Sequence, residues 1–505
     1  MHYVKRTLDI AEKEGIALTF DDVRLIPAYS EFLPDQVDLT SRFSKNIFLK
    51  IPVVSAAMDT ITEYRMAIEM AKNGGLGIIH KNFSPKEQAR QVSKVKHYLN
   101  GKIEDPICVK YDNTMEEVLN MREAKGYTFH SFPVLDANGR LMGIITKSNF
   151  DFCNDLSKKV KDIMKTPLIT ASENTTIEEA YKILLENEKG ILPLVRGTDE
   201  LVGIYVFSDV KRIVTANSGM YNTDSSGKLI VGAAIGGTQK DAFARLEELV
   251  KLKVDVVVID TAHGHSKNVI DTLKEIKQQY PQLDVVAGNI ATGKAAEDLA
   301  KAGADGVKVG MGPGSICTTR IIAGIGTPQL SAIYRCKKAL SDYDVPICAD
   351  GGLKNSGDIT IAIAGGADSV MMGNMLGGTD ESPGDLVTLD NRQWKKYRGM
   401  GSLSAMKEHK GSKERYQQGD RKTKNLFPEG IEALTPYKGK LADNLAQYMG
   451  GLQSGMGYTG TKSIKELQEK AQFDRITNAG LNESHPHDIF ITADAPNYRG
   501  GKSNA

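Results

Sequence analysis

One cysteine, Cys317, stands in a segment made almost entirely of glycine, proline and small hydroxyl residues, GMGPGSICTTR (310–320). Glycines in such a segment shape the backbone instead of filling a core, and ordering them has a large conformational entropy cost. A tight turn with an incidental cysteine accounts for the composition. A nucleophilic thiol that a substrate must approach closely also accounts for it, and this interpretation predicts covalent chemistry.

Two other loops carry residue types that bind phosphate and sugar, ADGGLKNSGD (349–358) and MMGNMLGG (371–378). Asp350 can accept hydrogen bonds from two sugar hydroxyls. The turns also offer closely approachable backbone amides, those of Gly351, Gly352, Gly373 and Asn374. A tight turn alone explains either loop, but the two together predict a nucleoside phosphate as the ligand.

A fourth segment, DTAHGHS (260–266), places two histidines beside an apolar run. A zinc site needs a third ligand, and no cluster of cysteine, histidine or glutamate lies near in the sequence. We therefore expect a polar rim around a ligand, with Asp260 accepting hydrogen bonds from a ribose.

These segments follow short apolar runs that alternate with amphipathic stretches. The runs are 51–58, 76–80, 228–235, 254–260, 283–289, 305–311, 345–352 and 368–374. Continuous apolar strands that alternate with helices indicate a parallel sheet covered on both faces. Eight such units predict an α/β fold with a closed eight-stranded β/α (TIM) barrel, whose chemistry lies at the carboxyl ends of the strands. An open doubly wound sheet remains the alternative.

A long insertion separates the second run from the third. It contains an internal repeat, because NTMEEV (113–118) matches TTIEEA (175–180) and GIITKSNF (143–150) matches GIYVFSDV (203–210). The repeat resembles a tandem cystathionine-β-synthase (CBS) module, a pair that binds adenine nucleotides. We predict a first part of the barrel at 1–90, this regulatory module at 91–217, and the second part of the barrel at 218–505.

By the same resemblance, an acidic residue near the end of each copy holds the ribose of a regulatory purine nucleotide. Asp209 takes this place in the second copy, whereas the first copy has Asn149. A purely structural insertion is the alternative.

Residues 384–430 show no clean hydrophobic period. An irregular segment this long inside a compact domain is typical either of a mobile lid or of disorder, and it is here called the flap. Arg415 lies near its middle, and its residue type alone predicts only a surface charge.

Composition and charge exclude several partners. The 505 residues include 64 basic and 63 acidic side chains, so the net charge of +1 gives no reason to expect nucleic acid. Five scattered cysteines favour a reducing compartment over a disulfide framework. The chain start does not resemble a signal peptide and no apolar run could span a bilayer, so we expect a cytoplasmic protein with no membrane partner.

Together the motifs resemble the inosine 5′-monophosphate (IMP) dehydrogenase family over essentially the whole chain. The resemblance rests on VGMGPGSICTTR, DTAHGHS, ADGGLKNSGD, YRGMGS, RYQQ, LFPEGIE and ESHPHD, with a CBS pair after the second strand. It implies oxidation of IMP to xanthosine 5′-monophosphate with NAD+ and water through a covalent cysteine thioimidate. This reaction is the committed step towards guanine nucleotides. The resemblance also implies a homotetramer that potassium activates.

The resemblance implies a role for each matching residue. Cys317 attacks carbon 2 of the purine and Thr319 helps to handle the hydrolytic water. Arg415 and Tyr416 lie on the flap, which enters the NAD site after NADH leaves, and the arginine acts as the base.

The implied binding residues fall into three groups. IMP is held by Ser315, Asp350, Gly351, Gly352, Gly373, Asn374, Tyr397, Gly399, Met400, Gly401 and Glu429. NAD+ is held by Asp260, Asn289, Gly310 and Gly312. Potassium is held by Gly312, Gly314 and Cys317, with Glu483, Ser484 and His485 from a neighbouring subunit. Many members have serine at the position of Asn374, and a backbone amide contact survives that change.

Two other functions stay open. A guanosine 5′-monophosphate (GMP) reductase shares the barrel, the cysteine loop and the phosphate site, and the CBS pair and the flap motif argue against it. A nucleotide-sensing protein with an inactive barrel is the other, and the presence of Cys317, Thr319, Arg415 and Tyr416 argues against it.

Overall fold

The computed structural model describes residues 5–99, 101–125, 127, 129–197, 199–215, 218–416, 418, 425–489, 491–492, 495 and 497–498. The chain divides into two compact units, one made of Met1–Lys96 with Met220–Ala505 and the other of His97–Gly219. The insertion predicted at 91–217 begins within α3 (Pro85–Lys96), a helix that belongs to the first unit.

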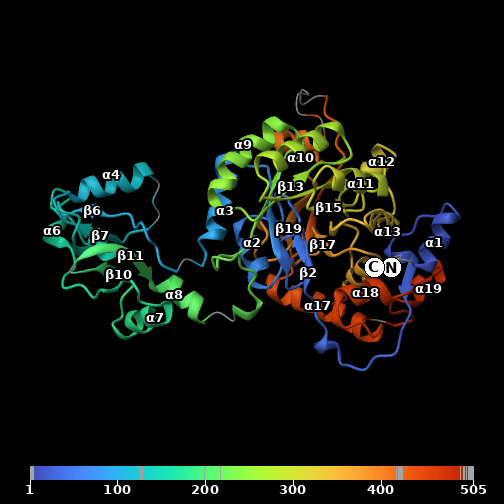
Figure 1. Ribbon diagram of the computed structural model, residues 1–505, viewed down its shortest axis with the longest axis horizontal. Coiled ribbons are helices and arrows are strands. Elements are labelled where there is room, and N and C mark those ends of the chain that lie inside the picture. Colours follow the sequence, from blue (N-terminus) through green and yellow to red (C-terminus); the bar gives the residue numbers. More distant parts are fainter. Residues whose placement is uncertain are drawn as a thin grey trace. The chain divides into compact units, whose positions relative to one another are not determined.

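Eight parallel strands close into a barrel in the first unit, in the order β12-β13-β14-β15-β16-β17-β4-β5 (Figure 1). The strands are β4 (Val53–Ser55), β5 (Leu76–Ile79), β12 (Gly232–Ile235), β13 (Val256–Asp260), β14 (Asp284–Ile290), β15 (Gly306–Val309), β16 (Ile347–Asp350) and β17 (Ser369–Met372). Each predicted apolar run contains one of them, except that β14 extends one residue beyond the run 283–289, so the predicted β/α barrel is confirmed. Pairing of β5 with β12 and of β17 with β4 excludes the open sheet.

The barrel strands are apolar on both faces because both faces are covered. All five residues of β13 are buried, although a strand with one wet face would alternate. Val54, Ile78, Val258 and Met371 belong to one cluster of buried side chains, contributed by strands far apart in the sequence. The sequence pattern and the packing therefore agree strand by strand.

Amphipathic helices cover the outside of the barrel (Figure 1). In α10 (Lys267–Gln279), Val269, Leu273 and Ile276 are buried at helical spacing, which fixes the inward face. The other helices of eight or more residues in this unit are α1 (Arg6–Lys13), α2 (Tyr64–Lys72), α3, α9 (Gln239–Leu249), α11 (Gly293–Lys301), α13 (Gln329–Ala339), α14 (Ser356–Ala364) and α17 (Leu441–Tyr458). Within the described ranges, no helix is long and apolar enough to cross a membrane.

Shorter elements complete this unit. They are the 3₁₀ helices Phe20–Asp22, Pro34–Gln36 and Val250–Leu252, the helices α12 (Thr319–Ile322), α18 (Ile464–Lys470) and α19 (Asn478–Glu483), and the strands β1 (Val23–Leu25), β2 (Ser41–Arg42), β3 (Phe48–Leu49) and β21 (Phe473–Arg475). The 3₁₀ helix Ser218–Met220 spans the boundary between the two units. The antiparallel pairing of β1 with β21 ties the start of the unit to its end.

The segment 384–430, predicted to be irregular, contains regular elements. They are β18 (Leu386–Leu389), β19 (Arg392–Arg398), α15 (Leu403–Glu408) and α16 (Lys410–Arg415), with β20 (Glu432–Pro436) just beyond. Asp390 and Asn391 join β18 to β19 at φ of 51° and 57°, which is a two-residue hairpin turn that the sequence signals.

The strand β19 escaped the sequence pattern because one of its buried positions is charged. Lys395 and Tyr397 are the buried residues of this strand. Lys395 donates to the carbonyl oxygens of Thr379 and Ser382, both at 2.8 Å, so its ammonium is satisfied inside the fold. Alternation of apolar and polar types therefore fails here although the strand is regular.

The second unit contains two three-stranded sheets of the same topology, β6-β7-β8 and β9-β10-β11, each with a parallel and then an antiparallel pair. The first half is β6 (Val109–Lys110), α4 (Met115–Lys125), β7 (Phe132–Leu135), β8 (Leu141–Ile145), α5 (Lys147–Asp151) and α6 (Val160–Ile163). The second half is β9 (Ala171–Ser172), α7 (Ile177–Glu186), β10 (Ile191–Arg196), β11 (Glu200–Val206) and α8 (Phe207–Thr215). Each half has its own buried cluster.

Candidate active site

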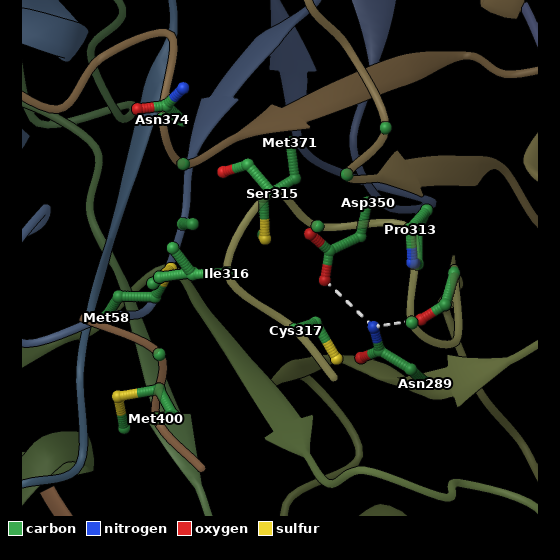
Figure 2. A pocket seen from close by; sticks show the side chains of 18 of the residues that line it. Met58, Asn289, Pro313, Ser315, Ile316, Cys317, Asp350, Met371, Asn374 and Met400 are labelled. Carbon is green, nitrogen blue, oxygen red and sulfur yellow. Dashed lines mark hydrogen bonds between the residues drawn. The ribbon is translucent and has the colours of Figure 1, made fainter. Parts of the chain in front are cut away.

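A cavity opens at the carboxyl ends of the barrel strands, and it collects most of the predicted site residues (Figure 2). Its lining includes Asp260, Asn289, Gly310, Gly312, Gly314, Ser315, Cys317, Thr319, Asp350, Gly351, Gly352, Gly373, Asn374, Tyr397, Gly399, Met400, Arg415, Tyr416 and Glu429. Gly401 does not line it, but its carbonyl oxygen accepts a hydrogen bond from the backbone N of the lining residue Glu429 at 3.0 Å. Glu483, Ser484 and His485 do not line it.

The cysteine loop between β15 and α12 needs its glycines. Gly310 and Gly312 have φ of 151° and 75°, in the region that favours glycine. A Cβ at Gly310 would overlap the carbonyl oxygen of Asp350. The Cys317 amide donates to the Gly314 carbonyl oxygen at 3.1 Å, which closes a turn and presents the thiol.

A second chain segment holds the cysteine loop from the other side. Thr318 N donates to the Glu429 carbonyl oxygen and Ile431 N donates to the Ile316 carbonyl oxygen, both at 3.0 Å. These bonds bring the segment LFPEGIE against the loop, 110 positions along the chain from Thr319. The thiol is thus held between two segments that lie far apart in the sequence.

Cys317, Thr319 and Glu429 form a linear relay of hydrogen bonds. The Cys317 Sγ donates to Thr319 Oγ1 at 3.2 Å, and Thr319 Oγ1 donates to Glu429 Oε2 at 2.8 Å. Thr319 is buried at the first turn of α12. The hydroxyl can therefore pass a proton between the sulfur and the carboxylate.

Lys308 is the charged centre of the cavity floor, and no sequence motif predicted it. Its side chain is 1% exposed, and its Nζ lies 3.0 Å from Asp260 Oδ1 and 2.6 Å from Asp350 Oδ2. It also donates to Asn289 Oδ1, while Asn289 Nδ2 donates to Asp350 Oδ2 at 2.9 Å (Figure 2). One buried cation thus orients two carboxylates and an amide. A lysine inside the apolar run DGVKVGM was the available signal.

Replacing Lys308 with methionine is expected to lower the free energy of unfolding by about 3–5 kcal/mol, because it leaves two carboxylates in the floor without their shared cation. Denaturant unfolding of the variant measures this loss. Lys301→Met is the matched control, because its ion pair with Glu297 lies at the surface and is expected to contribute no resolvable stability. Equal stability of the two variants would contradict the role given to Lys308.

Tight turns after β16 and β17 form a cradle of the kind that holds phosphate. Gly351 and Gly352 line the cavity with φ of 88° and 86°, in the region that favours glycine, and Gly351 N donates to the Met371 carbonyl oxygen at 3.4 Å. The Tyr397 hydroxyl contacts Ser315. It also packs closely on Gly373, because a Cβ at Gly373 would lie 3.0 Å from the Tyr397 hydroxyl oxygen. Burial raises the pKa of Tyr397 to about 12, so it is a neutral donor at physiological pH.

Asn374 is exposed at the rim of this cradle. Its Oδ1 accepts a hydrogen bond from Thr435 Oγ1 at 3.0 Å, which directs the amide NH₂ of the side chain away from that hydroxyl. The asparagine side chain is therefore oriented from outside the loop.

The helix α16 brings the flap residues over the cavity. Arg415 forms an ion pair with Asp260, and its carbonyl oxygen accepts from Ala262 N at 3.0 Å. The Tyr416 ring packs so closely that a Cβ at Gly401 would lie 2.6 Å from its Cζ. Burial lowers the pKa of Arg415 and raises the pKa of Tyr416 to about 12. Arg415, a surface charge by residue type, is here a buried neighbour of the site.

Lys81 lies buried next to the same helix, and within the described ranges no group accepts a hydrogen bond from its Nζ. Burial lowers its pKa to about 8. The negative charges of Asp241 and Glu414 raise this pKa, whereas the positive charges of Arg415 and Arg245 lower it. Protonated Lys81 therefore destabilises the fold at neutral pH.

Lys81→Met is expected to raise the melting temperature at pH 7. In the native state the lysine titrates near pH 8 and in the unfolded state near 10.5, so the unfolded state holds the extra proton between these values. The stability of the unmodified protein relative to the variant should then rise over that window. Thermal unfolding at pH 7 and pH 10 checks this, and an unchanged difference would contradict it.

The predicted potassium ligands are not brought together within one chain. Gly312, Gly314 and Cys317 lie in the cysteine loop, whereas Glu483, Ser484 and His485 are exposed at the end of α19. The prediction assigned the second set to a neighbouring subunit, and it stays a prediction.

Comparison with known proteins gives consistent matches. The family model "IMP dehydrogenase / GMP reductase domain" matches residues 17–487. Inosine-5′-monophosphate dehydrogenase of Halalkalibacterium halodurans is 49% identical over 490 residues, covering 96% of this chain and 98% of the relative. The enzyme of the same name from Aquifex aeolicus is 50% identical with the same coverage.

A solved structure also matches over nearly the full length. It is a cysteine-to-alanine variant of GMP reductase from Trypanosoma brucei in complex with guanosine 5′-monophosphate, with a TM-score of 0.82 and 39% identity. The match covers 95% of this chain and 100% of that chain. The match to a protein named GMP reductase thus covers the inserted unit as well as the barrel. The prediction that the insertion distinguishes an IMP dehydrogenase from a GMP reductase is therefore wrong.

Proposed function

The chain belongs to the family of IMP dehydrogenases and GMP reductases, and we propose that within this family it is an NAD-dependent IMP dehydrogenase. The proposed reaction converts IMP, NAD+ and water into xanthosine 5′-monophosphate, NADH and a proton. The observation that carries the proposal is the Cys317–Thr319–Glu429 relay beside an arginine that is docked over the same cavity.

IMP binds across the floor and the cradle in this proposal. Asp350, already oriented by Lys308, accepts from the ribose hydroxyls. The phosphate accepts hydrogen bonds from the amides of Gly352, Gly373 and Asn374 and from the hydroxyls of Ser315 and Tyr397. Gly399, Met400, Gly401 and Glu429 border the base, which places carbon 2 next to Cys317.

The first chemical step forms a bond between Cys317 Sγ and carbon 2 of the purine. The thiol proton leaves along Thr319 Oγ1 towards Glu429, since both contacts are already made. The nicotinamide of NAD+, when bound, accepts the hydride that leaves carbon 2. Asn289 and Asp260 fit its amide and ribose, and Gly310 and Gly312 leave room for a flat ring beside the sulfur.

The second step hydrolyses the thioimidate and needs the flap. Arg415 pairs with Asp260, the carboxylate assigned to the cofactor ribose. One carboxylate cannot serve both groups at once, so α16 docks after NADH has left. Burial lowers the pKa of Arg415, and in its neutral form Arg415 takes a proton from the water that attacks carbon 2. The C–S bond then breaks, the product leaves, and the sulfur regains its proton from Glu429 through Thr319 Oγ1. Arg415 passes the proton taken from water to the solvent.

Potassium and assembly belong to the same proposal. Carbonyl oxygens of Gly312, Gly314 and Cys317 suit a hard monovalent cation, and Glu483, Ser484 and His485 of a second copy complete the shell in a homotetramer. The inserted unit binds a purine nucleotide in its second half. Asp209, which is paired with Arg212 on α8, is the proposed ribose acceptor. Asn149 instead donates to the Ile163 carbonyl oxygen, so the first half is the weaker site.

Absorbance of NADH at its characteristic band tests the function directly. With IMP, NAD+ and potassium the proposal expects sustained NADH formation. GMP with NADPH, tested in parallel, is expected to give no oxidation of the reduced cofactor. The reverse pattern would establish the GMP reductase, and binding of nucleotide without turnover in either assay would establish a sensor with an inactive barrel.

A further inference from the structure

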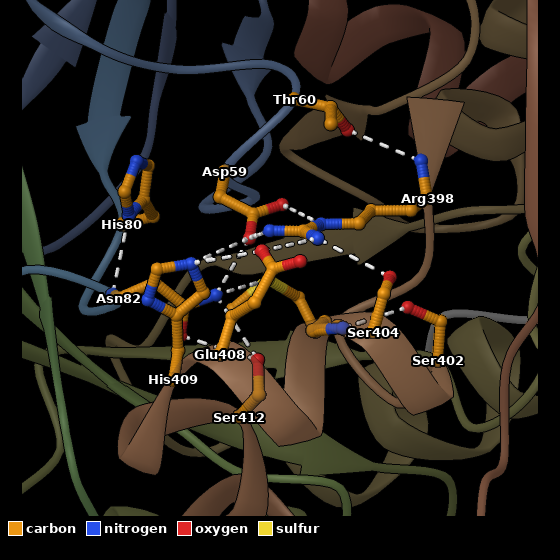
Figure 3. Close-up of polar contacts among 12 residues, drawn as sticks. Asp59, Thr60, His80, Asn82, Arg398, Ser402, Ser404, Glu408, His409 and Ser412 are labelled. Atoms are coloured by element: carbon orange, nitrogen blue, oxygen red, sulfur yellow. Dashed lines mark hydrogen bonds and ion pairs between the residues drawn. The ribbon is translucent and has the colours of Figure 1, made fainter. Parts of the chain in front are cut away.

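The structure assigns a positioning role to Asn82, which holds the helix that carries Arg415; the inference rests on the proposed part of Arg415 in hydrolysis. Asn82 lies in the loop after β5 and Ser412 on α16, and the two residues are 7% and 0% exposed. Asn82 Nδ2 lies 3.0 Å from Ser412 Oγ, and Ser412 Oγ lies 3.2 Å from Asn82 Oδ1 (Figure 3). Both polar atoms of the amide thus face one hydroxyl of the flap.

The position of Ser412 makes this contact decisive for Arg415. Residues three apart share a helix face, so Ser412 and Arg415 both face the barrel. Between them and the loop there is no spare room, because a Cβ at Gly411 would lie 2.7 Å from the Lys81 carbonyl oxygen. The helix is therefore seated on the loop after β5, and this seat sets where the guanidinium lies.

Asn82 is itself fixed by the barrel and does not follow the helix. Its Nδ2 donates to Asp59 Oδ2 at 2.8 Å, and its backbone N donates to His80 Nδ1 at 3.2 Å. Asp59 is in turn held by Arg398 at 2.8 Å (Figure 3). The helix α16 therefore packs on an Asn82 amide whose orientation is already fixed, as a positioning residue requires.

The amide suits this place because it can donate to a carboxylate and still bind a hydroxyl. A carboxylate in the same position would face Asp59 at hydrogen-bond distance and repel it. Asn82→Asp is therefore expected to release α16 at neutral pH and to restore it when the two carboxylates share a proton at lower pH. The other titratable or charged groups that face this point are His80, Arg398, Glu408 and His409.

The test separates the two chemical steps in the full-length protein. Asn82→Ala and Ser412→Ala are expected to keep the first burst of NADH and to slow steady turnover by roughly 5- to 100-fold, because a buried partner is left unpaired. Combining Asn82→Ala with Arg415→Ala is expected to slow turnover no further than Arg415→Ala alone. Ser404→Ala is the matched control, because Ser404 contacts Arg398 in the same cluster but not Ser412.

Hydrogen exchange of residues 403–415 with bound IMP gives a readout that does not depend on turnover. Both alanine variants are expected to lose protection, Asn82→Asp is expected to regain it as the pH falls, and Ser404→Ala is expected to keep it. Unchanged protection in both alanine variants would overturn the inference. So would a burst that falls in step with turnover, or an additive loss in the double variant. Failure of the unmodified protein to form NADH would instead refute the proposed function, and exchange would still decide the role of Asn82.

Discussion

Replacing Cys317 with alanine is expected to abolish NADH formation from IMP and NAD+, with a loss of about 10⁴-fold or more. The reason is chemical, because without the sulfur no covalent adduct forms at carbon 2 and the hydride has no route to the cofactor. The change should leave the fold intact, since Cys317 is only partly buried and its loop is held by backbone bonds. A stopped-flow record of NADH absorbance measures the loss.

Two measurements make this result specific. Binding of IMP to the Cys317→Ala variant, followed by calorimetry, is expected to stay near that of the unmodified protein because the cradle and the floor are untouched. Cys336→Ala controls for loss of a thiol elsewhere, since Cys336 is buried in α13 away from the cavity. NADH formed at the normal rate by the Cys317→Ala variant would falsify the assignment of the nucleophile.

Replacing Arg415 with alanine is expected to spare the first turnover and to slow the steady rate by about 10²–10⁴-fold, the range of a lost general base. Hydride transfer precedes docking of α16 in the proposed sequence, so the burst of NADH should reach one equivalent per site. The covalent intermediate should then accumulate, and mass spectrometry of the quenched enzyme detects it as an adduct on Cys317.

An exposed lysine on the same helix provides the control. Lys410→Ala removes a positive charge that is paired with Glu414 near the surface, and it should change neither phase. Loss of the burst in the Arg415→Ala variant would show that the arginine also acts before hydrolysis, for example by keeping Asp260 in place. A normal steady rate would show that another group activates the water.

In the proposed mechanism, the ion pair between Arg415 and Asp260 makes the flap and the cofactor exclude each other. Asp260 is 2% exposed and already contacts Lys308. It can hold a second partner on one side only, either a ribose or a guanidinium. In the proposal, the exchange of cofactor for flap follows from this shared carboxylate.

The sequence by itself determined the features that are written in neighbouring residues. Eight apolar runs predicted the eight barrel strands, because a parallel strand covered on both faces must be apolar throughout. The glycines around Cys317 predicted a loop that gives close access to a thiol. The polar residues at the strand ends were predicted to share one site, and the structure brings nearly all of them to one cavity.

Only the tertiary structure decided which of these groups act on each other. Asn82 and Ser412 are 330 positions apart and meet where α16 packs on the loop after β5. Lys308 and Asp350 are 42 positions apart and meet because β15 pairs with β16. By residue type Lys308, Lys395 and Arg415 are ordinary charges, because the burial of the two lysines and the ion pair of Arg415 with Asp260 depend on partners from distant elements. The local hydrophobic period predicts which face of an element is buried. It does not predict which side chain of another element will pair with a buried charge.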